Sequence, residues 1–303
     1  MIIGKGINKS FGSFSAVSDL HLHVNKGNVY GLVGPNGAGK TTLIKMLSGI
    51  IRPDSGTIQI DNQAAWENEK LRERMVYISD DLYFFAMATI RDLAMLYEGI
   101  YPGWNKERYQ KLKEAFPIEE TRRLVRLSKG MQKQVAFWLG LCAMPDIMIL
   151  DEPVDGLDPV MRRQVWSLML QDVAEREMTV LVSSHNLREL EDVCDHVGIL
   201  SQGRMLLEKN LDEVKANVYK IQVAFPSETA ETAIREISEQ FRILNKEVFG
   251  SVWRLIIKGG QEEVVAALRQ KSPLLLDWLP LTLEEVFIYE LGGEGYDVAN
   301  IVL

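Results

Sequence analysis

The chain has 303 residues, 47% of them hydrophobic and 25% charged, which is the composition of an ordinary globular protein with room for more than one domain. Its net charge of −8 argues against a nucleic-acid interface over the whole surface, and we expect no nucleic-acid partner. No apolar run reaches the roughly 18–20 residues of a membrane span, and the N-terminus MIIGKGINKS lacks a secretory signal pattern. We therefore expect the chain to stay in the cytosol unless a partner takes it elsewhere.

The first part of the chain predicts a mixture of strands and helices. Strict alternation of apolar and polar residues in LHLHV, at 20–24, predicts a half-buried strand. A short apolar strand over 28–34 is followed by a helix that ends at Gly49. The region of about 81–145 is mainly helical and predicts a helical subdomain. The apolar runs DIMIL and MTVLV predict strands buried on both faces of a parallel sheet.

The composition changes after about Asn217. From Tyr219 onward the periodicity predicts strand, helix, strand, strand, helix and strand, followed by a short last helix. The order βαββαβ is typical of a small ferredoxin-like domain. We therefore expect one domain over 1–217 and an accessory α+β domain over 218–303, with a loosely held tail after residue 291.

The segment GPNGAGKT, from Gly34 to Thr41, fits the pattern G-x-x-x-x-G-K-[ST] between a strand and a helix. Its glycines let backbone N–H groups point inward toward phosphate oxygens at the helix N-terminus. Lys40 is predicted to reach the β- and γ-phosphates, and the Thr41 hydroxyl to bind Mg²⁺. The alternative is a glycine-rich turn without a ligand. The other predicted phosphate-binding residues are Gly34, Asn36, Gly37, Ala38, Gly39 and Thr42.

The second motif that indicates chemistry is the acidic pair at the end of the strand in IMILDEP. Asp151 is placed to hold Mg²⁺ through its water shell, and Glu152 to orient and deprotonate the attacking water. A strand followed by an acidic turn is the competing interpretation. The phosphate-binding pattern upstream favours the first one.

In this order the motifs resemble the ATP-binding subunit of an ABC transporter. LSKGMQ resembles the signature LSGGQ, and VDGLDP resembles the D-loop with Asp158 at its acidic position. VSSHN places His185 like the switch histidine of the family, beside Glu152. KSFG places Phe11 like the aromatic residue that stacks on adenine, and Val17 is expected to pack on the same base. The resemblance covers roughly residues 1–217.

The resemblance implies a P-loop NTPase core of α/β class, with an antiparallel β subdomain, a helical subdomain and the ferredoxin-like C-terminal domain. It implies ATP and Mg²⁺ as cofactors, with Glu152 and His185 as catalytic residues. The signature would contact ATP held by an opposite subunit, so two subunits, alike or related, would sandwich two ATP molecules. Ser128 is also expected to cap a helix that begins at Met131. The signature residues are Ser128, Lys129, Gly130 and Met131.

Three positions depart from the family pattern. Asp80 stands where the family usually has a glutamine, and the hypothesis is that it contacts Mg²⁺ directly or through water. A solvated acidic loop is the alternative. Lys129 and Met131 replace the usual glycine and glutamine. Signatures of the LSKGM type and endings such as TLEEVFIYEL resemble the ABC-2 group of bacterial exporters.

The resulting prediction is an ATPase motor at the cytoplasmic face of the membrane, docked on a separate transmembrane permease subunit. Segment 82–104, rich in aromatic residues and methionines, would receive a permease helix or form plain helical core. The competing function is a soluble ABC ATPase acting on ribosomes or DNA, against which stand the single ATPase unit and the absence of a coiled-coil insertion. Intact Lys40, Asp151, Glu152 and His185 argue against a subunit that does not hydrolyse ATP.

Overall fold

The computed structural model describes residues 2–215 and 217–292, which form two compact units, Met1–Lys209 and Asn210–Leu303. The expected tail after residue 291 lies outside the described residues except for Gly292. Among the helices of the described ranges, none has the length and apolar character needed to cross a membrane. Each unit is described by itself below.

A six-stranded sheet forms the centre of the first unit, in the strand order β10-β9-β3-β8-β7-β6. The pairs β3–β8, β3–β9, β6–β7 and β7–β8 are parallel, as the continuous apolar runs predict. Parallel pairing brings the carboxyl ends of these strands to one edge of the sheet. The strands are β3 (Val29–Val33), β6 (Met75–Ile78), β7 (Ile147–Asp151), β8 (Thr179–Ser184), β9 (His196–Ser201) and β10 (Arg204–Asn210).

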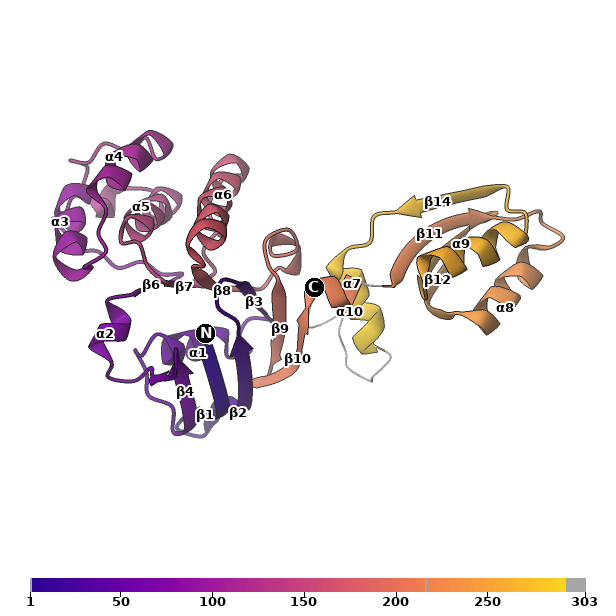
Figure 1. Cartoon of the computed structure of the whole chain (residues 1–303), viewed down its shortest axis with the longest axis horizontal. Helices are drawn as coiled ribbons and strands as arrows, with labels where there is room; N and C mark the ends of the chain where they lie inside the picture. Colours follow the sequence, from indigo (N-terminus) through magenta and orange to yellow (C-terminus); the bar gives the residue numbers. More distant parts are fainter. Residues whose placement is uncertain (1, 216, 293–303) are drawn as a thin grey trace. The chain divides into compact units, whose positions relative to one another are not determined.

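A four-stranded antiparallel sheet in the order β2-β1-β4-β5 lies on one side of the central sheet (Figure 1). Its strands are β1 (Ile2–Phe11), β2 (Phe14–Val24), β4 (Ser55–Ile60) and β5 (Gln63–Ala64). The alternation predicted for β2 is confirmed, since Leu20, Leu22 and Val24 are buried. These side chains share one core with α1 (Lys40–Leu47) and with the central strands, so α1 is held between the two sheets.

Helices cover the opposite side of the central sheet (Figure 1). They are α3 (Ile90–Ile100), α4 (Lys106–Ala115), α5 (Lys129–Cys142) and α6 (Pro159–Arg176). The short α2 (Glu69–Arg72) instead packs through Leu71 into the core that contains α1. The unit also has two 3-10 turns, Leu124–Arg126 and Leu187–Glu189. Trp138 on α5 stacks on Tyr109 of α4, with ring centroids 4.8 Å apart. Helix α5 begins at Lys129, two residues before the expected start at Met131, because Ser128 accepts a hydrogen bond from the Met131 N–H at the third helical position.

The second unit has the element order predicted from its periodicity. The strands β11 (Val218–Ala224), β12 (Arg242–Phe249), β13 (Val252–Lys258) and β14 (Leu275–Leu279) pair antiparallel in the order β12-β13-β11-β14. The helices α8 (Ala230–Gln240) and α9 (Gln261–Gln270) complete βαββαβ, with α10 (Leu283–Gly292) after it. A separate core joins Ile221, Leu255 and Ile234. The short α7 (Leu211–Lys215) precedes the first strand.

Candidate functional site

The predicted site residues follow four neighbouring strands of the parallel sheet. The register pairs Asp151 of β7 with Ser183 of β8, and Val33 of β3 with Ser184 of β8. The loops after these strands therefore begin side by side at the carboxyl edge of the sheet, together with the loop that follows Ile78 of β6. Segments far apart in the sequence are brought together there.

The loops after β3, β6 and β7, together with residues of β2, line a cavity of about 250 Å³. Most of its wall is the loop between β3 and α1, which the sequence predicts as a phosphate site. Asp80 and Glu152 complete one side of the cavity. The lining residues are Phe14, Ala16, Pro35, Asn36, Gly37, Ala38, Gly39, Lys40, Thr41, Thr42, Asp80 and Glu152.

The loop before α1 has the properties of an anion site. Gly39 precedes the helix with φ of 104°, and a Cβ there would lie 2.4 Å from the carbonyl oxygen of Ala16, so only glycine fits. Within the described chain, α1 has no side-chain cap and no acidic residue in its first turn. The uncapped N–H groups and the helix dipole therefore favour a negative group at this end.

Lys40 brings a cation into the same cavity. Its side chain is 6% exposed, and Nζ donates a hydrogen bond of 2.6 Å to the Gly34 carbonyl oxygen. Nζ also lies 3.3 Å from Glu152 Oε1, so an anionic oxygen already fits opposite the ammonium group. The residues present thus suit phosphate oxygens, in both charge and space.

Glu152 is the residue in which the contacts of the site converge. Its Oε2 lies 3.0 Å from His185 Nδ1, at the end of β8. Its backbone has φ of 45°, an unusual value for a residue with a side chain. The Glu152 N–H donates to Ser183 Oγ at 3.1 Å, and that hydroxyl donates to Asp151 Oδ1 at 2.6 Å. Asp151 is buried, so its carboxylate has a fixed place at the strand end.

Asp80 and Lys133 form an ion pair beside Glu152. Lys133, on α5, is buried, and its Nζ lies 3.1 Å from Asp80 Oδ1 and donates to the Glu152 carbonyl oxygen at 2.7 Å. Sequence patterns did not identify Lys133, because a lysine on an exposed-looking helix face carries no sign of a buried partner. Nearby, burial raises the pKa of Tyr77, helped by the charges of Asp151 and Asp80, which keeps its phenol neutral.

The signature and D-loop residues lie against each other. A Cβ at Gly130 would be 2.5 Å from the Gly156 carbonyl oxygen, so the start of α5 requires glycine where it contacts the D-loop backbone. Asp158 caps α6, with Oδ1 accepting from the N–H groups of Val160 and Met161 at 3.0 and 3.1 Å. The signature residues do not belong to the described lining of the cavity.

The expected adenine residues occupy different environments. Phe11 is 49% exposed and pairs across the β1–β2 hairpin with Phe14. In the described structure Phe14, and not Phe11, is on the wall of the cavity. Val17 is buried in the core of the antiparallel sheet. The sequence offers Phe14 only as a second aromatic residue three positions after the first.

Asp155 is a further acidic residue that the sequence reasoning missed. Its carboxylate, that of Glu152 and the imidazole of His185 each offer an atom within 4.8 Å of the others. Its place in VDGLDP, directly after the acidic strand end, was the available signal.

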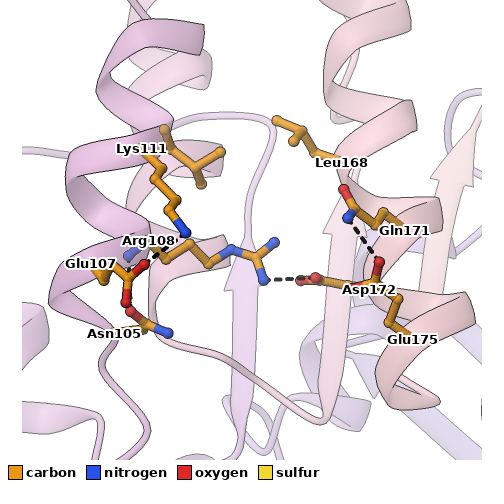
Figure 2. Close-up of a pocket in the computed structure, with 9 residues that line it drawn as sticks. Asn105, Glu107, Arg108, Lys111, Leu168, Gln171, Asp172 and Glu175 are labelled. Carbon is orange, nitrogen blue, oxygen red and sulfur yellow. Dashed lines mark hydrogen bonds and ion pairs between the residues drawn. The ribbon is translucent and has the colours of Figure 1, made fainter.

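A second cavity, of about 320 Å³, lies between α4 and α6 (Figure 2). Arg108 of α4 reaches across it to the buried Asp172 of α6, with Nη1 2.7 Å from Oδ1. Arg176 contacts the other carboxylate oxygen at 3.0 Å. This cavity is therefore crossed by an ion pair that joins the helical region to the helix following the D-loop.

Comparison with known proteins identifies the family. The family model described as ABC transporter matches residues 17–155. The ABC transporter ATP-binding protein YtrB of Bacillus subtilis (strain 168) is 34% identical over 97% of this chain and 99% of its own. The bacitracin transport ATP-binding protein BcrA of Bacillus licheniformis is 32% identical over 95% of this chain and 96% of its own.

Solved structures agree with this result. A structure of an ATP-binding subunit of an ABC transporter matches with a TM-score of 0.65 and 27% identity, over 71% of this chain and 92% of that one. The chain belongs to the ATP-binding proteins of ABC transporters and is an ATPase of the ABC class. The expected fold class, with its P-loop NTPase core, is confirmed.

Proposed function

We propose that this chain is the ATP-hydrolysing motor subunit of an exporter, acting at the cytoplasmic face of a membrane on a separate permease subunit. One observation carries the catalytic part of the proposal: the Glu152 carboxylate lies 3.3 Å from Lys40 and 3.0 Å from His185 at a cavity walled by the phosphate-binding loop. A base, a phosphate-directed cation and an orienting imidazole thus meet at one place.

The chain's own residues have distinct roles in this reaction. The loop from Gly34 to Thr42 binds the phosphate oxygens through backbone N–H groups, and Lys40 neutralises their charge. Glu152 accepts the proton of the attacking water, and His185 orients the reacting groups. Thr41 and Asp151 would hold Mg²⁺, which would supply charge neutralisation on the phosphates. Asp80, the third residue predicted for this ion, lies on the cavity wall with its Oδ1 3.1 Å from Lys133 Nζ.

The purine base would stack on an aromatic residue of the β1–β2 hairpin. Phe14 is favoured over Phe11 because it lies on the cavity wall and is 61% exposed. Substitution of each phenylalanine by alanine in turn tests the choice. The dissociation constant for ATP is expected to rise with Phe14→Ala and to stay unchanged with Phe11→Ala.

A second subunit is required to complete the site. Lys129 is 87% exposed at the N-terminus of α5, and the signature as a whole lies outside the described cavity wall. We propose that Ser128, Gly130 and their neighbours contact ATP held by the partner subunit, through the N-terminal N–H groups of α5. One solved neighbour, at 21% identity, is a dimeric ATP-binding cassette in a post-hydrolysis state bound to ADP and phosphate.

Glu152→Gln tests the catalytic assignment. The substitution removes the base but keeps the shape of the side chain, so we expect ATP to remain bound and to hold two subunits together. Turnover should fall by about a hundredfold or more. Size-exclusion chromatography with light scattering should detect a dimer only with ATP, and Lys40→Ala, which weakens phosphate binding, should stay monomeric. Retained turnover in Glu152→Gln would remove Glu152 as the base.

The surface proposed for the permease lies beside α3. A groove of about 400 Å³ is bordered by Ile50, Tyr77, Ile100 and Tyr101. Segment 82–104 has a buried part and an exposed part. Ile90 and Ala94 are buried and the Tyr97 ring meets that of Trp104 edge-on, so one part is helical core. Apolar side chains that remain exposed on the other part favour an amphipathic permease helix as the occupant; they are Phe85, Met87, Met95 and Leu96.

We infer export from the kinds of compound that relatives are named for. BcrA is named as a bacitracin transport protein, and a relative from Escherichia coli (strain K12), 31% identical over 71% of this chain and 38% of its own, as a probable multidrug transporter protein. The decisive experiment is recovery of tagged Glu152→Gln protein from detergent-solubilised membranes of its host with ATP and Mg²⁺. A multi-span membrane protein in stoichiometric amount is expected. Met87→Glu with Met95→Glu should lose it while still binding ATP. Recovery of ribosomes or nucleic acid would overturn the motor assignment.

A further inference from the structure

Lys133 is a buried cation that the proposed reaction does not use. Its side chain is 5% exposed, whereas that of Asp80 is 52% exposed. A buried ammonium group is costly unless it is paired and hydrogen-bonded. Lys133 meets both conditions through Asp80 Oδ1 at 3.1 Å and the Glu152 carbonyl oxygen at 2.7 Å. Lys133 does not belong to the described lining of the phosphate cavity. It contacts the Glu152 backbone, and not the carboxylate that faces Lys40.

The backbone of Glu152 needs such support. With φ of 45°, it occupies the left-handed region, which is unfavourable for a residue with a Cβ. Its N–H is held by Ser183 Oγ and its carbonyl oxygen by Lys133 Nζ. Both polar backbone groups of the residue are therefore fixed by side chains from different elements. In this conformation the side chain reaches both Lys40 and His185.

We propose that Asp80 and Lys133 form a positioning pair that sets the geometry of Glu152 and ties it to α5 and to the loop after β6. Lys133 holds the Glu152 carbonyl oxygen, and Asp80 holds and neutralises Lys133. The pair also explains how an acidic residue is tolerated on the wall of a phosphate site, since its charge is matched by a buried cation. The inference rests on the proposed function, in which Glu152 is the base.

The test combines single and double substitutions. Lys133→Met keeps the length and apolar stem of the side chain but removes both contacts, and Asp80→Asn removes the charge that holds the lysine. We expect either change to lower kcat by about tenfold to a hundredfold with KM for ATP within about threefold, because base geometry changes while phosphate binding does not. Lys133→Arg, which keeps a donor and a charge, should recover part of kcat.

The coupling between the two residues is the most specific readout. A double-mutant cycle of Asp80→Asn and Lys133→Gln measures it. The double variant keeps an uncharged amide donor and acceptor, so its fold-loss of kcat should be smaller than the product of the fold-losses in the two single variants. Additive effects would overturn the pair. So would a higher Mg²⁺ requirement in Asp80→Asn that Lys133→Met lacks, because Asp80 would then be a metal ligand. A joint loss of kcat and ATP binding in Lys133→Met would assign Lys133 a purely structural role and overturn the proposal.

Measuring turnover of Glu152→Gln in parallel separates the assignment of Glu152 as the base from the proposal of the positioning pair. If Glu152→Gln is inactive but Lys133→Met turns over like the unmodified chain, the positioning pair is wrong and the proposed base stands. If Glu152→Gln turns over normally, the base assignment is wrong, and the positioning proposal is overturned with it. If both are impaired, adding Lys133→Met to Glu152→Gln should cause no further loss, since Lys133 acts through Glu152. A further loss would contradict that dependence.

Discussion

At the scale of single residues, Gly130 is constrained by its distance from another chain segment. A Cβ there would approach the Gly156 carbonyl oxygen to 2.5 Å, and Gly156 itself has φ of 77°. We predict that Gly130→Ala displaces the D-loop and lowers ATP turnover by about tenfold, with ATP binding to the phosphate loop unchanged. Steady-state kinetics and equilibrium ATP binding check this. Gly99→Ala is the matched control, because a Cβ at this α3 position meets no atom within 4 Å, and it should turn over normally.

The environment of the two cysteines predicts how fast their thiols are alkylated at a given pH. Burial raises the pKa of the Cys142 thiol to about 12 and that of Cys194 also well above its ordinary value. A raised thiol pKa lowers the thiolate fraction at pH 8, for Cys142 by about a thousandfold relative to a thiol of pKa 9. Iodoacetamide should therefore label neither thiol quickly at pH 8, whereas the unfolded chain should react at both. Rapid labelling of Cys142 in the native chain, measured by mass spectrometry, would contradict this.

The sequence predicts chemistry well where a residue's role follows from its neighbours in the chain. The loop from Gly34 to Thr42 is of this kind, since the pattern itself contains the strand end, the turn and the helix start. The roles of Lys133 and Phe14 do not follow from their neighbours in the chain. Their positions at or behind the cavity depend on how α5 and the β1–β2 hairpin pack, which no local spacing encodes.

At the scale of elements, a buried carboxylate links α4 to α6. Asp172 is 2% exposed and accepts from Arg108, as the view across the cavity shows (Figure 2), and also from Arg176. Removing it by Asp172→Ala leaves two partly buried guanidinium groups unpaired, at a cost of about 3 kcal/mol. Native-state hydrogen exchange of the α4 amides should become about a hundredfold faster.

Glu107 supplies the control for this prediction. It lies on the wall of the same cavity, but its carboxylate is exposed and pairs with Lys111 on its own helix. Because exposed pairs contribute little, Glu107→Ala should leave the exchange of the α4 amides unchanged. Equal rates in the two variants would show that the ion pair across the cavity does not hold α4 against α6.

Element order was more predictable than element boundaries. The βαββαβ series of the second unit follows from hydrophobic periods of 2 and 3.6, which persist for whole elements. The start of α5 was misplaced by two residues because the Ser128 cap bonds to the third helical N–H, not the first. Helix α7, Leu211–Lys215, is too short to show a period.

At the scale of the whole molecule, the chain has two units that each bury an apolar core of their own. One core lies between the two sheets of the first unit, and the other, around Ile221 and Leu255, lies in the second. All residues of the phosphate cavity belong to the first unit. Since stability follows burial within a unit, we expect the two units to unfold separately.

Calorimetry of the Glu152→Gln chain should therefore show two transitions. Bound ATP at a hundred times its dissociation constant stabilises the unit that holds it by about 2.7 kcal/mol, and the transition of the other unit shifts only if that unit is a dimer contact. A chain shortened to residues 1–217 should keep the ATP-sensitive transition and lose the other. A single transition that shifts as a whole would contradict independent units.

The same shortened chain decides the role of the second unit. If that unit is a dimer contact, the ATP-dependent dimer should weaken without it. If it is an appendage, dimerisation and turnover should be unchanged.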